Sequence, residues 1–206
     1  MIAKHLAKDT RLTRAVKGNP GLRVPGAFNG FELGLRAILG QQVTVKAATT
    51  IACRFVEAFG EPIVTPFPKL HRLSPSPGRV ARASVDDIAR LGIVSARARS
   101  IIAMAKAEHS GALGLDGGSH HNPDDSIRQL TMLPGIGPWT AQYIAMRAMR
   151  WPDAFPKEDI AVRNNLGGVS AREAELLSQA WRPWRSYAVM HVWNMGKPVV
   201  PLTEPQ

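Results

Sequence analysis

The residues most able to carry chemistry lie between positions 133 and 159. A glycine-rich turn connects two stretches of helical periodicity and reads Leu133-Pro134-Gly135-Ile136-Gly137; Pro138, a residue type favoured in the first turn of a helix, follows it. Glycines leave the main-chain amides of a turn uncovered, and amides at a helix N-terminus bind anions. Asp159 then ends a proline-containing loop. The stretch predicts an anion-binding turn followed by a carboxylate.

Both features also have a purely structural interpretation. The turn can be a joint in which small residues let two helices pack closely. Asp159 precedes Ile-Ala-Val, and an aspartate in that position is typically a helix N-cap. The two interpretations of Asp159 are compatible, because the amides at a helix start hold a carboxylate ionised. It can then stabilise developing positive charge or act as a general base.

The composition points to an anionic partner. The formal net charge is +10 and the isoelectric point is about 10.5, and so basic a protein associates with nucleic acid or with acidic membranes. On charge alone we favour nucleic acid. The longest apolar runs fall far short of the ~20 residues that span a bilayer.

The residue inventory argues against most metal and disulfide chemistry. Cys53 is the single cysteine, which excludes an internal disulfide and any four-cysteine zinc or iron–sulfur site. The histidines are scattered without ligand spacing. We therefore expect no required cofactor, and a reducing, cytoplasmic environment.

The periodicity of the chain is helical, and no strand alternation of useful length occurs. Capping residues mark helix starts at Asn29, Ser84, Asn122 and Ser170. We expect an all-α orthogonal bundle.

Several segments carry specific expectations. Apolar residues between positions 2 and 16 predict one helical face, and residues 61–80 predict an ordered loop. The helix after the hairpin is expected to run to about Arg150. Residues 111–121 predict a mobile loop, and the tail after Lys197 is expected to be exposed.

Aromatic residues cluster around the same stretch. Trp139 and Tyr143 are spaced so that they share one helix face. With Trp193 they predict a stacking pocket, and electron-rich rings attract a cationic ligand by roughly 0.5 to 2 kcal/mol. Trp181 and Trp184 are assigned to the core.

Two further segments complete the pattern. They read Arg36-Ala37-Ile38-Leu39-Gly40-Gln41-Gln42-Val43 and Arg182-Pro183-Trp184-Arg185-Ser186-Tyr187. With the hairpin, Asp159 and Trp193, they resemble the helix–hairpin–helix (HhH-GPD) DNA glycosylase superfamily. The resemblance runs from about Pro20 to Trp193 and is closest to the branch of DNA-3-methyladenine glycosylase II (AlkA-like).

The resemblance implies one glycosylase domain in two lobes. Its fold is an all-α, two-lobed orthogonal helical bundle of the helix–hairpin–helix DNA glycosylase type, without the β-sheet domain that precedes the helical core in the closest relatives. One lobe is expected at about residues 30–151, with the helix–hairpin–helix at 123–150. Residues 1–29 and 152–206 form the second lobe, which carries the Asp and Trp193.

The resemblance also assigns roles to residues. DNA is bent, the damaged nucleotide is flipped out, and Asp159 assists cleavage of the N-glycosidic bond. Leu133, Pro134, Gly135, Ile136 and Gly137 are expected to bind the DNA backbone. The base pocket is expected at Trp139, Tyr143 and Trp193. The DNA wedge candidate is Gln42, where relatives often carry leucine. A sodium or potassium ion is expected on the carbonyls of Thr131, Leu133 and Ile136.

The implied function is a monofunctional DNA glycosylase for alkylated, cationic purines such as 3-methyladenine and 7-methylguanine, the first step of base excision repair. Relatives that also cleave the strand carry a Schiff-base lysine at the position of Trp139, so no lyase activity is expected. The expected partner is double-stranded DNA with alkylated bases. We expect a nucleoid-associated monomer, which is either a minimal form or part of a longer fusion with another repair domain.

Two alternatives stay open. One is a non-catalytic helix–hairpin–helix module that binds DNA, although such a module has no need of a carboxylate at position 159. The other is a glycosylase of the same fold for another lesion, such as mismatched adenine, oxidised guanine or uracil.

Overall fold

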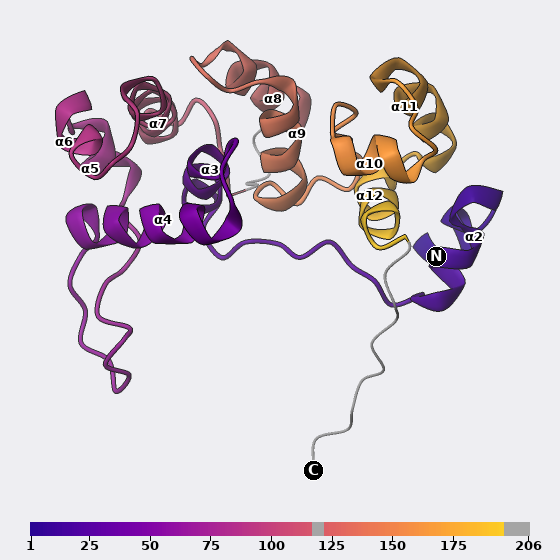
Figure 1. Cartoon of the computed structure of the whole chain (residues 1–206), viewed down its shortest axis with the longest axis horizontal. Coiled ribbons are helices and arrows are strands. Elements are labelled where there is room, and N and C mark those ends of the chain that lie inside the picture. The colour runs from indigo at the N-terminus through magenta and orange to yellow at the C-terminus, as the bar shows by residue number, and fades with distance from the viewer. Residues whose placement is uncertain (117–121, 196–206) are drawn as a thin grey trace. The chain divides into compact units, whose positions relative to one another are not determined.

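The computed structural model describes residues 1–116 and 122–195 (Figure 1). Within these residues the regular structure is helical, apart from one isolated antiparallel bridge between Pro62 and Arg72. The prediction of an all-α chain is confirmed for this part of the protein. None of the helices described is both long enough and apolar enough to cross a bilayer.

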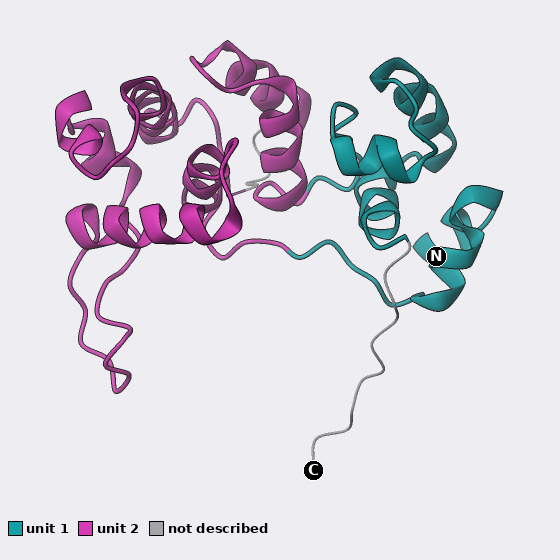
Figure 2. Cartoon of the chain, in the orientation of Figure 1, with its two compact units in different colours: residues 1–25, 151–206 teal, residues 26–150 magenta. Residues whose placement is uncertain are grey.

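The chain divides into two compact units (Figure 2). Unit 1 comprises residues 1–25 and 151–206, and unit 2 comprises residues 26–150. The boundaries drawn from the sequence lie at 29/30 and 151/152. Unit 2 is therefore a continuous segment inserted between the two segments of unit 1.

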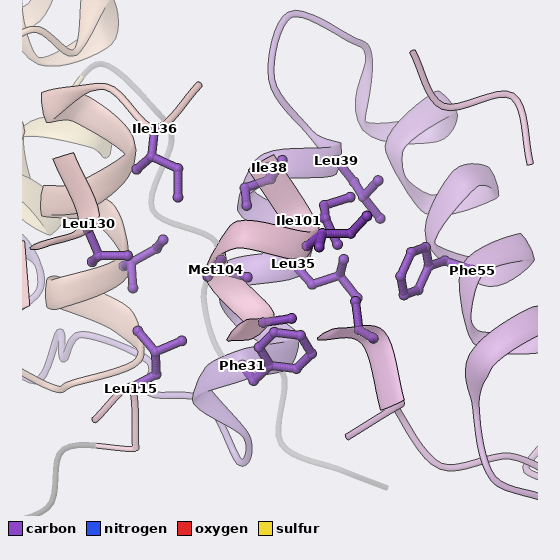
Figure 3. Packing of buried hydrophobic residues seen from close by; sticks show 14 of the residues in the cluster. Phe31, Leu35, Ile38, Leu39, Phe55, Ile101, Met104, Leu115, Leu130 and Ile136 are labelled. Atoms are coloured by element: carbon purple, nitrogen blue, oxygen red, sulfur yellow. The ribbon is translucent and has the colours of Figure 1, made fainter. Parts of the chain in front are cut away.

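Unit 2 is built on a central helix, α3, which packs against α4, α7 and α9. The helices of this unit are α3 (Gly30–Leu39), α4 (Val45–Phe59), α5 (Pro77–Ala81), α6 (Val85–Ala89), α7 (Ser95–His109), α8 (Pro123–Met132) and α9 (Pro138–Arg147). Its core, shown in Figure 3, includes Phe31, Leu35, Ile38 and Leu39 of α3, Phe55 of α4, Met104 of α7 and Leu130 of α8. Ile136, from the glycine-rich turn, belongs to the same cluster. The turn is thus anchored in the core.

Unit 1 is organised around α12, which packs against α2 and α10. Its helices are α1 (Ile2–Leu6), α2 (Thr10–Gly18), α10 (Ile160–Asn165), α11 (Ala171–Ser178), the short 3-10 helix η1 (Gln179–Trp181) and α12 (Arg185–Trp193). Trp181 is fully buried, as predicted. Trp184, the residue before the first turn of α12, is only half-buried, and its ring packs edge-to-face against Tyr187. The core assignment of Trp184 was therefore wrong.

The N-terminal segment forms two helices where one was expected. Asp9 lies between α1 and α2 and caps α2, because its carboxylate accepts a hydrogen bond from the Arg11 amide at 2.9 Å. The indole of Trp181 donates to the same carboxylate at 2.7 Å. Although burial raises the pKa of Asp9, the hydrogen bonds from Arg11 and Trp181 lower it overall. The ionised Asp9 therefore caps α2 at the point where the sequence had predicted one continuous helical face.

Some of the other element boundaries expected from the sequence are confirmed, and others were wrong. The caps at Asn29, Ser84, Asn122 and Ser170 are all confirmed. The expected loop 61–80 was wrong at its end, where Ser76 and Pro77 begin α5. The helix after the hairpin ends at Arg147, before the expected Arg150. Part of the expected loop at 111–121, residues 117–121, lies outside the described residues, as does the tail after Lys197.

Candidate functional site

The glycine-rich turn between α8 and α9 depends on one glycine in particular. Gly135 has φ +72°, a left-handed backbone that favours glycine. A Cβ atom at Gly135 would also lie 2.3 Å from Oγ of Ser100, in α7. Ile136 is only 4% exposed and pins the turn to the core. Position 135 therefore has both a conformational and a steric reason to be glycine.

The start of α9 presents main-chain donors rather than side chains. Gly137 is the N-cap and provides no side-chain cap, while Pro138 occupies the first turn. Within the described residues, neither the amide of Gly135 nor that of Gly137 has a hydrogen-bond acceptor. Nothing lies within 4 Å of the Cβ position of Gly137, so this side of the turn is open. Such a helix start is suited to an anion.

The connection between α3 and α4, which we call the Gln42 corner, is hydrogen-bonded to the turn. It holds Gln42 at φ +56°, an uncommon conformation for a residue with a side chain. The neighbouring Gln41 donates through Nε2 to the carbonyl of Gly135 and to Oγ1 of Thr140, each at 3.1 Å. Sequence reasoning named Gln42 but missed Gln41. The Gly40-Gln41-Gln42 break in helical periodicity marked the corner, and nothing in the sequence indicated what it contacts.

Trp139 and Tyr143 lie on one face of α9, as their spacing predicts. Their rings stack with centroids 5.3 Å apart and planes inclined by 12°. The guanidinium carbon of Arg147 lies 5.7 Å from the centroid of the Tyr143 ring, and Arg147 donates to the Tyr143 hydroxyl at 3.3 Å. The Arg147 guanidinium thus lies at the Tyr143 end of the pair.

Asp159, in unit 1, is the N-cap of α10, so that prediction is confirmed. Its Oδ1 accepts from the amide of Val162 at 2.8 Å and from Nε1 of Trp193 at 3.1 Å. The residue is only 8% exposed. The sequence had placed Trp193 in a base pocket, and the structure gives it a direct hydrogen bond to the carboxylate. Two donors on one oxygen fix the orientation of the carboxyl group.

The segment Arg182–Tyr187 supports the loop that leads to Asp159. The buried guanidinium of Arg185 donates to Oδ1 of Asp153 at 2.9 Å and to the Asp153 carbonyl at 2.7 Å. The Ser186 hydroxyl donates to the carbonyls of Trp151 and Ala154, at 2.7 and 3.0 Å. This part of the sequence motif therefore fixes a backbone, a role that sequence reasoning did not assign.

His191 lies two positions before Trp193 on α12 and is 2% exposed. Burial lowers the pKa of its imidazole, against the opposing effect of a hydrogen bond to the backbone of Ala15. The ring is therefore neutral at neutral pH and adds no positive charge to the helix that carries Trp193.

Comparison with known proteins identifies the scaffold. The family model of the HhH-GPD superfamily of base excision DNA repair proteins matches residues 35–185. The chain belongs to this superfamily. The matched segment contains the glycine-rich turn, the Gln42 corner and Asp159, so the family inferred from the motifs is confirmed.

Named HhH-GPD relatives are longer than this chain. The probable bifunctional transcriptional activator/DNA repair enzyme AlkA of Mycobacterium tuberculosis is 39% identical over 197 residues, which cover 94% of this chain and 39% of that protein. DNA-3-methyladenine glycosylase 2 of Escherichia coli is 35% identical over 182 residues, covering 88% of this chain and 63% of that protein. The chain thus spans less than two thirds of either relative.

A solved structure supports the HhH-GPD fold. The Schizosaccharomyces pombe 3-methyladenine DNA glycosylase, in complex with abasic DNA, superposes with a TM-score of 0.76 at 21% identity, covering 96% of this chain and 97% of that one. The predicted fold is confirmed. At this identity the likeness concerns the fold alone.

The predicted site residues of this HhH-GPD protein fall into two groups. Unit 2 contains the hairpin Leu133–Gly137, Gln42 and the Trp139–Tyr143 pair, and unit 1 contains Asp159 and Trp193. Gln41 brings the hairpin and the Gln42 corner together in unit 2. In unit 1 the Trp193–Asp159 hydrogen bond brings the other two together.

The described residues contain no group of three or more His, Cys, Asp or Glu side chains arranged to hold a metal ion. The chemistry of the hairpin carbonyls does fit a monovalent cation. Thr131 lies in the last turn of α8, where carbonyls lack intrahelical donors. The Leu133 carbonyl accepts the Ile136 amide at 3.2 Å and retains a second lone pair.

Proposed function

We propose that this chain is the glycosylase core of an enzyme that removes alkylated purines from double-stranded DNA by hydrolysis of the N-glycosidic bond. The observation that carries the proposal is the buried Asp159 carboxylate, oriented by the Val162 amide and the Trp193 indole. A mere cap needs the first of these donors. The second donor, from a different helix, fits a group that must hold one orientation during a reaction.

Unit 2 supplies the DNA contact in this proposal. The uncovered amides of Gly135 and Gly137 bind a phosphate, and the net charge of +10 draws the protein to the duplex. Main-chain donors do not read sequence. Such binding suits an enzyme that must search all sequences for damage.

The aromatic residues account for the class of base. An alkylated purine is cationic, so electron-rich rings attract it. The guanidinium of Arg147 already lies against the Tyr143 ring at that end of the stacked pair. We therefore assign the flipped base to the Trp139 end. The names of the relatives, DNA-3-methyladenine glycosylases among them, support the same substrate class.

The chemistry follows from the leaving group. As the bond between C1′ and the base nitrogen breaks, the base takes the bonding electrons and leaves as a neutral molecule. Asp159 stabilises the positive charge that develops on the sugar. Water adds to C1′ and loses one proton to the carboxylate or to solvent, which leaves an abasic site. A cationic base departs without acid assistance.

Finer assignments belong to the same proposal. Trp139 has no amine to form a Schiff base with the sugar, so the strand is left uncut. A sodium or potassium ion on the carbonyls of Thr131, Leu133 and Ile136 would hold the hairpin against the phosphate. The protein acts as a monomer on DNA inside the cell.

The test is an excision assay on duplex DNA treated with a methylating agent. Released bases are separated by chromatography, and the DNA is resolved on a gel with and without alkali. We expect 3-methyladenine and 7-methylguanine in the supernatant, and strand breaks only after alkali. Release of no base, together with tight binding to DNA, would overturn the proposal in favour of the binding module. Strand breaks without alkali would overturn the monofunctional assignment.

A further inference from the structure

Gln41 connects two parts of unit 2 that lie far apart in the sequence. Its side-chain amide donates to the carbonyl of Gly135, 94 positions away, and to Oγ1 of Thr140, the third residue of α9. Its own carbonyl accepts a hydrogen bond from Arg97 of α7 at 2.7 Å. One residue thus joins the α3–α4 corner, the hairpin and α7.

The contact to Gly135 uses the carbonyl side of the peptide. The amides of Gly135 and Gly137 are without acceptors among the described residues, whereas the Gly135 carbonyl is occupied by Gln41. The Gly135 carbonyl shares a rigid peptide plane with the Ile136 amide, which donates to the Leu133 carbonyl at 3.2 Å. The Gln41 bond therefore holds the peptide that lies between the Gly135 and Gly137 amides. Gln41 therefore supports the hairpin from the carbonyl side of this peptide.

The adjacent residue needs such support. Gln42 is exposed, and its φ of +56° lies in a region that residues with side chains rarely adopt. A backbone of this kind persists only when its surroundings determine it. The bonds made by the main chain and side chain of Gln41 provide that constraint immediately before Gln42.

We propose that Gln41 is a positioning residue that sets the Gln42 corner in register with the phosphate-binding hairpin, so that anchoring the backbone and inserting Gln42 into the base stack occur as one event. The inference rests on the proposed function. In physical terms, a phosphate held at the hairpin places the corner at a set distance along the duplex. Without the Gln41 hydrogen bonds, the hairpin and the Gln42 corner are both still present, but they are no longer held at a fixed distance from each other.

The test replaces Gln41 with methionine, which keeps the length of the side chain and removes its donors. The matched control is Gln129→Met, an exposed glutamine on α8 outside the network. At saturating enzyme we expect Gln41→Met to slow single-turnover excision by about tenfold or more, because a small misplacement of a positioned group costs that much. Affinity for undamaged duplex should stay that of the control. Excision as fast as in Gln129→Met would overturn the inference.

A double-mutant cycle distinguishes a role of Gln41 in positioning Gln42 from a general loss of structure in unit 2. If Gln41 acts through Gln42, the Gln41→Met/Gln42→Ala protein should be no slower than Gln42→Ala alone. Losses that multiply would show that Gln41 acts elsewhere, and would overturn the inference. Should Gln41→Met lower the melting temperature, Thr140→Val removes one of the two acceptors and should show a smaller loss with the same coupling.

A readout without turnover distinguishes this inference from the proposed function. Fluorescence of 2-aminopurine next to an abasic-site analogue reports insertion into the stack. We expect the signal change with wild-type protein and its loss in Gln41→Met. An insertion signal that depends on Gln41, in a protein that releases no base, would reject the enzyme and retain the inference. A signal indifferent to Gln41 would reject the inference alone.

Discussion

The hairpin of unit 2 and the Asp159 site of unit 1 place different demands on the chain. At the hairpin the functional groups are main-chain amides, and a side chain at Gly135 or Gly137 would obstruct the turn or the phosphate. At Asp159 the functional group is one side chain, and the surrounding helices hold it in place. Binding the backbone of any DNA requires main-chain amides in a fixed conformation, whereas the reaction requires a carboxylate held in one orientation. Changes in the two regions should therefore have separable effects.

The largest effect is expected from Asp159→Asn. Asparagine is also a good N-cap and can accept from Val162 and Trp193, so α10 should remain folded. The charge is lost, and removal of such an electrostatic group costs about 10²- to 10³-fold in rate. Single-turnover release of methylated purines measures the loss, and circular dichroism checks the fold. Release at the wild-type rate would show that Asp159 is only a cap.

Gly135→Ala should mainly affect stability. The alanine must adopt a left-handed backbone and displace Ser100, so the free energy of unfolding should fall by about 2 kcal/mol. Urea denaturation followed by circular dichroism gives the value. Combining the change with Ser100→Ala removes the obstructing Oγ and should recover part of the loss. No loss in Gly135→Ala would mean that the turn tolerates a side chain there.

A smaller effect is expected from Trp193→Phe. The ring is retained but the hydrogen bond to Asp159 is lost, and a bond to a charged group is worth about 1.5 kcal/mol, roughly tenfold in rate. Trp184→Phe is the matched control, because Trp184 lies at the start of the same helix and packs edge-to-face against Tyr187. Equal excision rates for the two variants would contradict an orienting role for Trp193.

Local signals in the sequence predicted local structure well. The caps at Asn29, Ser84, Asn122, Ser170 and Asp159 act within the first turn of their own helices, so a short stretch of sequence contains all that is needed. The glycine-rich turn and the stacked pair on α9 are local in the same sense.

Contacts between distant parts of the chain were not predictable in this way. The Asp9 carboxylate that caps α2 is also bonded to Trp181, 172 positions away. The support of the Asp159 loop depends on Arg185, bonded to Asp153 across 32 positions. The link from Gln41 to Gly135 spans 94 positions. Each requires the tertiary fold to bring its partners together, and no spacing rule encodes it.

The central claim is that unit 2 binds and unit 1 reacts. The most direct test measures two quantities, the Kd for undamaged duplex and the single-turnover excision rate at saturating enzyme, in Asp159→Asn and in Gly137→Val. Position 137 has an ordinary backbone and open space, so valine should be accepted without loss of fold. It would obstruct an approaching phosphate.

We predict that Gly137→Val weakens the Kd by roughly tenfold, about 1.4 kcal/mol, for all sequences alike, and that saturation restores its excision rate. Asp159→Asn should keep the Kd and lose the rate. Loss of both quantities in both variants, or an unchanged Kd in Gly137→Val, would contradict the account.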